Sequence, residues 1–226
     1  MVRSVAYAAA LSLSATSAFA ACDAVRFSDV GWTDITATTA LAATVLEGLG
    51  YRADVQVLSV PVTYASLGRG EIDVFLGNWM PTMEADIRPY LDAGTVEDLG
   101  PNLTGAKYTL AVPAYLHEAG LRDFADIAAF ADQLDGRIYG IEAGNDGNRL
   151  ILDMIEADMF GLGSFRLVES SEQGMLAQVA RAVQRNQPIV FLGWEPHPMN
   201  ANFDMEYLTG GDEVFGPDFG GAQVHT

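Results

Sequence analysis

The chain has 226 residues, of which 50% are hydrophobic and 19% charged, and its formal net charge is −18 at pH 7. The length suffices for one domain or for two small lobes. The negative charge argues against nucleic acid and anionic lipid as partners, since both are themselves negative. It is compatible with a cationic ligand, although most surface charges only keep a protein soluble.

The first twenty residues have the pattern of an export signal. Arg3 supplies a positive start, residues 5–15 form a short apolar stretch, and residues 18–20 (Ala-Phe-Ala) fit a small-x-small cleavage site. The apolar run is too short for a membrane-spanning helix. We therefore expect residues 1–20 to be a signal peptide and the mature chain, from about Ala21, to act in the periplasm.

Cys22 is the one cysteine and lies just past the expected cleavage point. A lipid anchor is one interpretation, although Phe19 stands where such signals usually carry Leu. An unpaired cysteine in an exported protein often indicates a missing partner. Residues 222–225 look like a strand that is only beginning, so we expect the chain to lack a C-terminal part.

Strand and helix patterns alternate along the chain. In order, they predict a strand at 25–30, a helix at 34–49, a strand at 55–60, a helix at 62–69, a strand at 72–77, a helix at 83–93 and a strand at 96–99. The series continues with a strand at 108–112, a helix at 124–134, a strand at 138–141, a helix at 146–160, a strand at 165–168, a helix at 173–185 and a strand at 189–192. This alternation predicts an α/β fold with mostly parallel sheets covered by helices.

The first predicted helix, residues 34–49, carries an apolar stripe. The residues that recur at helical spacing are Ile35, Leu41, Val45, Leu46 and Leu49. We expect this stripe to face the sheet and Gly50 to end the helix.

Residues 105–206 hold a strand and helix series of their own. We therefore expect two lobes, the first made of residues 21–104 with residues 207–226 returning to it, and the second of residues 105–206. The chain would cross between the lobes near Gly105 and near Asp204. A ligand in the cleft between the lobes would be enclosed when they close.

All three tryptophans, Trp32, Trp79 and Trp194, follow a short strand-like run and a glycine. In an open α/β sheet, ligands bind just past the carboxyl ends of the strands. We therefore expect the three indoles to line one site in the cleft. Such a cage attracts a cation without hydrogen-bond donors, above all a quaternary ammonium. The alternative is that each is an ordinary core tryptophan.

Three further residues are candidates for the same site. Tyr108 begins the first strand of the second lobe and is either a fourth wall or a packing residue. Asp34 is placed to cap the helix that follows it and, if it faces the cage, to attract the cation. Asn145 precedes a helix, and its side chain either caps that helix or hydrogen-bonds a hydroxyl group of the ligand.

Enzyme chemistry finds little support in the sequence. His117, His197 and His225 are too scattered for a metal site, and we expect neither metal nor cofactor. Glu195 and His197 are a candidate acid–base pair, but such a pair is more often a contact at a cleft edge. The glycine-bearing start of the helix near residue 146 could receive an anion, although Asp146 argues against phosphate.

Four phrases resemble a known family. Residues 25–34 (VRFSDVGWTD), 77–81 (GNWMP), 140–145 (GIEAGN) and 193–197 (GWEPH) are similar, in this order, to the glycine betaine/choline substrate-binding proteins of ABC importers. The similarity is greatest to the choline branch and covers nearly all of the mature chain. It implies a two-lobed, type II periplasmic binding fold that closes over its ligand and catalyses no reaction.

The resemblance also implies the ligand site. In the choline branch the trimethylammonium group lies in a four-walled aromatic box, and the matching positions here are Trp32, Trp79, Tyr108 and Trp194. Asp34 matches a residue beside the ligand, and Asn145 matches one near the choline hydroxyl. Relatives continue beyond Thr226 and complete the first lobe, so we expect the missing part to have held the partner of Cys22.

We therefore expect a monomeric periplasmic protein that binds choline and delivers it to a membrane permease with a cytoplasmic ATPase. Choline is favoured over glycine betaine because the betaine carboxylate would meet Asp34 and Glu195, with only His197 as a donor. Three alternatives remain: a glycine betaine or carnitine-binding protein, a periplasmic enzyme acting on methylated amines through Glu195 and His197, and a module that presents its ligand to a chemosensor.

Overall fold

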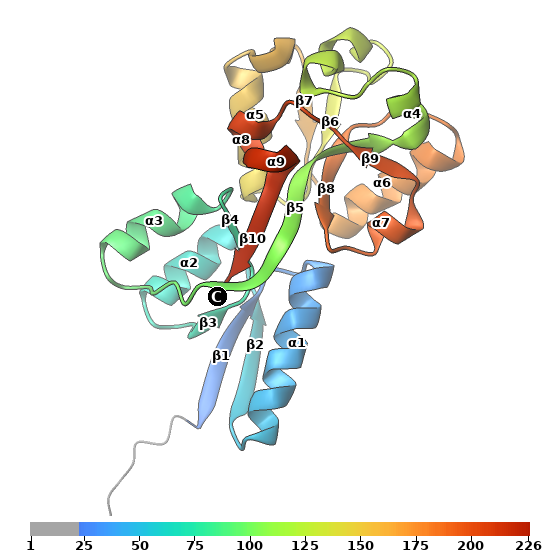
Figure 1. Ribbon diagram of the computed structural model, residues 1–226. Coiled ribbons are helices and arrows are strands. Elements are labelled where there is room, and N and C mark those ends of the chain that lie inside the picture. The colour runs from blue at the N-terminus through green and yellow to red at the C-terminus, as the bar shows by residue number, and fades with distance from the viewer. Residues whose placement is uncertain (1–22) are drawn as a thin grey trace, which may run out of the picture.

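The computed structural model describes residues 23–226, and the expected signal peptide and Cys22 lie outside this range. The described chain forms two lobes. They are joined by two strands that run from one lobe to the other, β5 (Pro101–Pro113) and β10 (Gly221–His225) (Figure 1). None of the described helices combines the length and the apolar character that a membrane crossing requires.

The N-terminal lobe is built on a small parallel sheet. Strand β1 (Ala24–Asp29) lies in the centre and pairs in parallel with β2 (Arg52–Val57) and with β3 (Val74–Phe75). The helices of this lobe are α1 (Thr33–Gly48), α2 (Val60–Gly68) and α3 (Glu84–Asp92). The short connections between these strands and helices follow the expected βαβ pattern.

A larger sheet links the two lobes. Its remaining strands are β4 (Asn78–Met80), β6 (Arg137–Tyr139), β7 (Arg166–Val168), β8 (Phe191–Glu195) and β9 (Met205–Tyr207). The order is β4-β10-β5-β8-β6-β7, with β9 paired to the end of β5. The pairs of β6 are parallel, whereas β5 and β10 pair antiparallel with all their neighbours. The linking strands therefore differ from the parallel units on either side.

Short helices surround the part of this sheet that lies in the second lobe. They are α4 (Ala114–Glu118), α5 (Asp146–Glu156), α6 (Glu172–Gln184), α7 (Met199–Asn202), α8 (Asp212–Phe215) and α9 (Pro217–Gly220), with 3-10 turns η1 (Phe124–Phe130) and η2 (Met159–Gly161). The core beneath them includes Leu110, Ala111 and Val112 of β5, none of which is exposed. The C-terminal half of β5 thus belongs to the core of the second lobe, and its N-terminal half links the two lobes.

Residues 205–220 pack against the second lobe before the chain returns. Strand β9 pairs with the end of β5, and the ring of Phe215 lies 5.8 Å from that of Tyr108 and 5.9 Å from that of Phe124. Only β10 leads back, to pair with β4 of the N-terminal lobe. These contacts favour a crossing near Gly221; the lobe limits at residues 104, 105, 206 and 207 stay a prediction.

The predicted α/β alternation is confirmed in most segments, but two assignments are wrong. Residues 96–99 form no strand, because Asp98 accepts a hydrogen bond from the backbone N–H of Gly100 (2.7 Å) and turns the chain. Residues 124–130 form the 3-10 turn η1 rather than an α-helix. The sequence analysis also missed β4 and β9, which are short and depend on pairing with distant strands.

The tryptophans do not all follow strand ends, which corrects the sequence analysis. Trp32 lies in the loop between β1 and α1, but Trp79 lies within β4 and Trp194 within β8. The reason is antiparallel pairing, in which Trp79 is opposite Val224 and Trp194 is opposite Tyr108. These ladders continue the strands through residues that the sequence alone places in turns.

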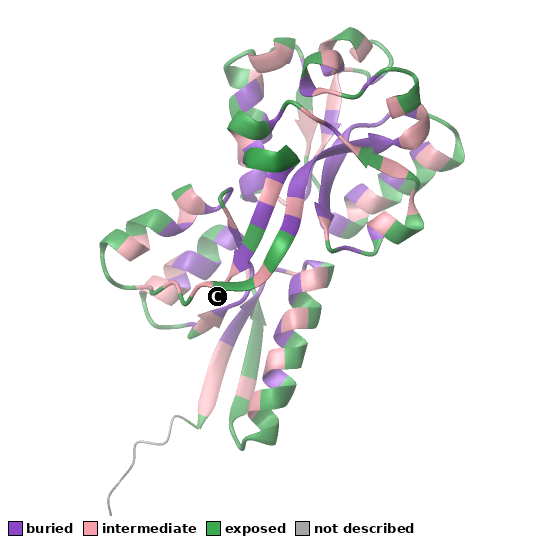
Figure 2. Cartoon of the chain, in the orientation of Figure 1, coloured by how far each residue is buried: buried purple, intermediate pink, exposed green. Residues whose placement is uncertain are grey.

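Helix α1 packs through a face that only partly matches the predicted stripe, since Ile35 is buried and Leu46 half-buried. Its buried residues are Ile35, Thr39 and Ala43, which recur every four positions. Leu41, Val45 and Leu49 of the predicted stripe are 68%, 56% and 69% exposed. Two of the three buried side chains are small, which allows the helix to lie close to the sheet. Figure 2 shows the exposed residues along α1 and along β2.

The packing of Phe215 gives a prediction about stability. Replacing the fully buried Phe215 by Ala should lower the free energy of unfolding by about 3–5 kcal/mol, because a cavity forms between Tyr108 and Phe124. Phe219 is 47% exposed, so Phe219→Ala should change the free energy of unfolding by less than about 1 kcal/mol. Urea denaturation followed by circular dichroism measures both, and equal losses would contradict the packing described here.

Candidate functional site

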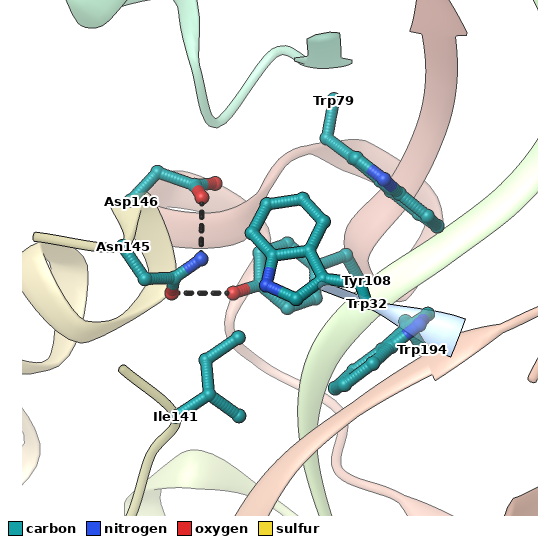
Figure 3. Close-up of a pocket in the computed structure, with 7 residues that line it drawn as sticks. All are labelled: Trp32, Trp79, Tyr108, Ile141, Asn145, Asp146 and Trp194. Carbon is teal, nitrogen blue, oxygen red and sulfur yellow. Dashed lines mark hydrogen bonds between the residues drawn. The ribbon is translucent and has the colours of Figure 1, made fainter. Parts of the chain in front are cut away.

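A small cavity lies where the two lobes meet. The residues that line it are Trp32, Trp79, Tyr108, Ile141, Asn145, Asp146 and Trp194 (Figure 3). Four of the seven are aromatic. Trp32 and Trp79 come from the N-terminal lobe, Tyr108 from the linking strand β5, and Trp194 from the second lobe. Both lobes are therefore needed to form the walls.

The rings meet around Tyr108. The centroid of Tyr108 lies 5.8 Å from that of Trp79 and 6.2 Å from that of Trp194, and the latter pair is nearly perpendicular at 83°. Tyr108 and Trp194 are direct cross-strand partners in β5 and β8, so the sheet itself places their side chains on one face. The four residues are only 3–5% exposed. Their ring faces thus form a box that is shielded from solvent.

Two indole N–H groups are fixed by carboxylates across the cleft. Nε1 of Trp32 donates to Oε1 of Glu142 (2.7 Å), and Nε1 of Trp194 donates to Oδ1 of Asp34 (3.2 Å). In the first bond the donor belongs to the N-terminal lobe and the acceptor to the second lobe, and in the second bond the reverse holds. A carboxylate acceptor also polarises the indole. The closed arrangement therefore both orients these rings and makes them more electron-rich.

The first turn of α1 receives a hydrogen-bond partner from the second lobe. Trp32 is the N-cap of α1 and makes no side-chain capping bond. Instead, Oε2 of Glu172 accepts from the backbone N–H of Thr33 (2.8 Å), and Oε1 accepts from the Thr33 hydroxyl. N–H groups at a helix start have no partner within the helix. Closure of the lobes therefore satisfies a donor that opening would return to water.

His197 holds Glu172 in place. Its Nδ1 accepts from the backbone N–H of Met199 (2.9 Å), so Nε2 carries the proton and donates to Oε1 of Glu172 (3.1 Å). The imidazole also lies 4.8 Å from the ring of Trp194. Both ring nitrogens are thus occupied, and neither partner is Glu195. The alternative of an acid–base pair between Glu195 and His197 is not realised.

Asn145 caps α5 and lines the cavity at the same time. Its Oδ1 accepts from the backbone N–H of Asn148 (3.1 Å) and from the Tyr108 hydroxyl (3.0 Å). Its Nδ2 donates to Oδ1 of Asp146 (2.9 Å). The side chain is therefore engaged on both of its polar atoms by protein groups.

Five of the six predicted site residues line one cavity: Trp32, Trp79, Tyr108, Asn145 and Trp194. Asp34 lies beside the cavity, where it contacts the indole N–H of Trp194, and is not one of the lining residues. Ile141 and Asp146 also line the cavity, although the sequence analysis did not propose them. Asp146 directly follows Asn145, and this adjacency was the available indication. The ligand-binding role of each residue stays a prediction.

Burial dominates the electrostatics of the cleft. It raises the pKa of Asp34 and of Asp146 to about 6 and also raises the pKa of Glu142. Burial acts in the same direction on Glu172, but hydrogen bonds from His197 and Thr33 outweigh it and lower the pKa. No Lys, Arg or His belongs to the lining residues. A site with carboxylates and electron-rich rings, and without a cationic side chain, favours a cationic ligand.

The described residues contain no group of three or more His, Cys, Asp or Glu side chains placed to hold a metal ion. The side chains that line the cavity supply four aromatic rings, one amide and one carboxylate.

Residues 23–226 match a family model described as the substrate-binding domain of the ABC-type glycine betaine transport system. A glycine betaine/carnitine transport binding protein from Listeria monocytogenes is 35% identical over 95 residues, which are 42% of this chain and 31% of that protein.

Two solved structures share 70% sequence identity with the chain and cover 90% of it, which is 71% of their own length. One is an ABC-transporter choline binding protein in complex with choline, with a TM-score of 0.89. The other is an ABC-transporter choline binding protein in an unliganded, semi-closed conformation, with a TM-score of 0.83. The lobes are thus arranged more as in the choline complex. These similarities confirm the α/β, two-lobed, type II periplasmic binding fold.

The contact between Glu172 and the start of α1 gives a prediction about closure. Glu172→Ala should open the ligand-free protein, because Thr33 loses its partner across the cleft. We expect a larger radius of gyration in small-angle X-ray scattering and faster hydrogen exchange at the Thr33 amide. Glu156→Ala, at an exposed position of α5 in the same lobe, is the control and should change neither. Identical scattering from both variants would show that Glu172 does not hold the lobes together.

Proposed function

The chain belongs to the family of substrate-binding domains of ABC-type glycine betaine transport systems, and we propose that it binds choline in its aromatic cage and delivers it to an ABC permease. Family members and the relatives described above are transport proteins, not enzymes. The observation that carries the proposal is the box of four rings with no cationic side chain in its lining. Such a box suits a trimethylammonium group, which offers charge but no hydrogen-bond donor.

The cage is sufficient for useful affinity without any covalent step. Each cation–π contact contributes roughly 0.5–2 kcal/mol, and desolvation moves the value towards the upper end. Three or four such contacts in a preformed box, with the apolar area that the methyl groups bury, reach the order of micromolar binding. The low exposure of the four rings favours the upper end of that range.

Choline suits the cavity better than glycine betaine does. The two ligands share the trimethylammonium group and differ at the other end, where choline carries a hydroxyl and betaine a carboxylate. The polar lining residues are Tyr108, Asn145 and Asp146, and Asp146 would repel a second carboxylate. Without Lys, Arg or His in the lining, no cationic side chain compensates that repulsion. Asp34 and Glu195, which were expected to repel the betaine carboxylate, do not line the cavity.

Binding is coupled to closure of the lobes. The walls join only when the N-terminal lobe, which carries Trp32 and Trp79, meets the second lobe, which carries Trp194. A ligand that contacts all four rings therefore binds the closed form more tightly and shifts the population towards it. The permease would then distinguish loaded from empty protein by the shape of the closed lobes.

The setting of this activity follows from the family. ABC-importer binding proteins work outside the cytoplasmic membrane, and the pattern of residues 1–20 supports export to the periplasm. We propose that the protein acts there as a monomer, because each chain brings its own four walls. The residue roles proposed are those of Trp32, Trp79, Tyr108 and Trp194 as walls, with Asp34 and Asn145 beside them.

The proposal is tested by isothermal titration calorimetry. Choline should bind at least tenfold more tightly than glycine betaine. Trp194→Leu keeps an apolar side chain but removes the π face, so it should weaken choline binding by at least tenfold while circular dichroism stays unchanged. Equal affinities, or tighter binding of betaine, would instead make the chain a glycine betaine-binding protein.

Affinity should also depend on pH. A bound cation favours ionised carboxylates, so binding lowers the pKa of Asp34 and Asp146 from about 6 and releases protons. Affinity is therefore full well above pH 6 and is lost as the pH falls through 6. If one carboxylate must ionise, choline binds about tenfold more weakly at pH 5 than at pH 7.5.

Calorimetry at constant ionic strength, with circular dichroism at each pH, measures this dependence. Burial also raises the pKa of Glu142, whereas the lowered pKa of Glu172 keeps that carboxylate ionised over this range. An affinity that stays constant or rises towards pH 5 in folded protein would contradict a role for the carboxylates.

A further inference from the structure

The three indoles of the cage differ in what their N–H groups contact. The N–H of Trp32 donates to Glu142 (2.7 Å), and that of Trp194 donates to Asp34 (3.2 Å). The N–H of Trp79 is buried and has no hydrogen-bond partner in the described part of the chain. All three rings line the same cavity (Figure 3) and are 3–5% exposed. Burial therefore does not distinguish the three walls, whereas a carboxylate at the N–H does.

A carboxylate at the N–H changes what an indole offers to a cation. The hydrogen bond moves electron density into the ring, and the carboxylate adds its own negative charge nearby. Both effects strengthen the attraction of the ring face for a positive charge. Neither acts on a neutral group of the same shape. Trp32 and Trp194 should therefore attract charge more strongly than Trp79.

The backbone of the second lobe holds Glu142 firmly beside the cavity. Nδ2 of Asn148, which is 1% exposed, donates to the carbonyl oxygens of Ile141 (3.0 Å) and Glu142 (3.1 Å). The Glu142 side chain is half-buried and does not line the cavity. Burial raises the pKa of its carboxyl group, and the hydrogen bond from Trp32 acts in the opposite direction. The carboxylate thus contacts a wall of the cage without being a wall itself.

We propose that Glu142 is a positioning residue that sets how strongly the cage prefers a cation to a neutral molecule of the same shape, and that it acts through the indole of Trp32. This inference rests on the proposed function and adds a residue outside the cavity lining to those that determine affinity. Because Glu142 and Trp32 belong to different lobes, this part of the preference arises only when the cleft closes. In the open form the N–H of Trp32 returns to water.

The test compares choline with 3,3-dimethylbutan-1-ol, in which a carbon replaces the quaternary nitrogen and the charge is absent. Isothermal titration calorimetry at about pH 8, which keeps Glu142 ionised, gives both dissociation constants, that of the alcohol by competition with choline. Glu142→Gln keeps an oxygen that accepts from Trp32 but removes the charge. It should weaken choline binding by about fivefold and change binding of the alcohol by less than about twofold.

Glu142→Leu separates the charge from the orientation of the ring. Leu offers Trp32 no acceptor, so the indole also loses its fixed orientation. Binding of the alcohol should now weaken as well, by about threefold or more, and choline binding should be weaker than in Glu142→Gln. The indole N–H resonance of Trp32 in nuclear magnetic resonance spectra shows whether the hydrogen bond persists, as we expect in Glu142→Gln and not in Glu142→Leu.

Glu169→Gln is the matched control. Glu169 belongs to the same lobe and accepts from a side-chain amide, Nδ2 of Asn148 (3.1 Å), but it is exposed and does not line the cavity. This variant should leave the ratio of the two dissociation constants unchanged. If Glu142→Gln keeps the native ratio, or weakens both ligands equally, the inference is overturned while the cage stands. If no quaternary ammonium binds the native protein, the proposed function and the inference both fail.

Discussion

The site depends on two hydrogen bonds that cross the cleft in opposite directions. Trp32 of the N-terminal lobe donates to Glu142 of the second, and Trp194 of the second lobe donates to Asp34 of the first. An indole has a single donor, so a bond to that donor sets the position of its nitrogen and the direction of its N–H bond. Without these bonds the rings would still be buried aromatic residues, but their faces would not have to converge. The bonds exist only when the lobes meet, which makes the geometry of the cage a property of the closed state.

The same contacts explain why the closed protein favours a cation. Closure buries Asp34, Glu142 and Asp146, and burial raises the pKa of each. Glu172 is the exception, because Thr33 and His197 supply the donors that an ionised carboxylate needs. A positive charge in the cage compensates carboxylates that closure alone leaves desolvated. Ligand and closure therefore stabilise each other, and a ligand without the charge lacks this part of the stabilisation.

Local patterns predicted the lobes and the identity of the walls, but for a partly wrong reason. The hydrophobic runs and capping residues predicted most strands and helices, and the strand-like runs before Trp32, Trp79 and Trp194 indicated a shared site. Yet Trp79 and Trp194 lie within strands, because pairing with β10 and β5 extends β4 and β8. Pairing between residues so far apart in the sequence leaves no local trace. The apolar stripe of α1 was only partly right, since Ile35 is buried but Leu41, Val45 and Leu49 are exposed, and the small residues Thr39 and Ala43 are buried instead.

The polar residues show a more general limit, because capping and ligand binding use the same side chains. The sequence analysis left both roles open for Asn145 and Asp34. Asn145 does cap its helix, yet it also lines the cavity and holds Asp146. Asp34 gives α1 no cap, and Glu172 of the other lobe supplies that partner instead. A cap that arrives from another lobe makes the helix start sensitive to closure. The start of α1 therefore has its hydrogen-bond partner only when the cleft is closed. Local sequence rules identify candidate capping residues, but they cannot say whether such a residue caps its own helix or a helix of the other lobe.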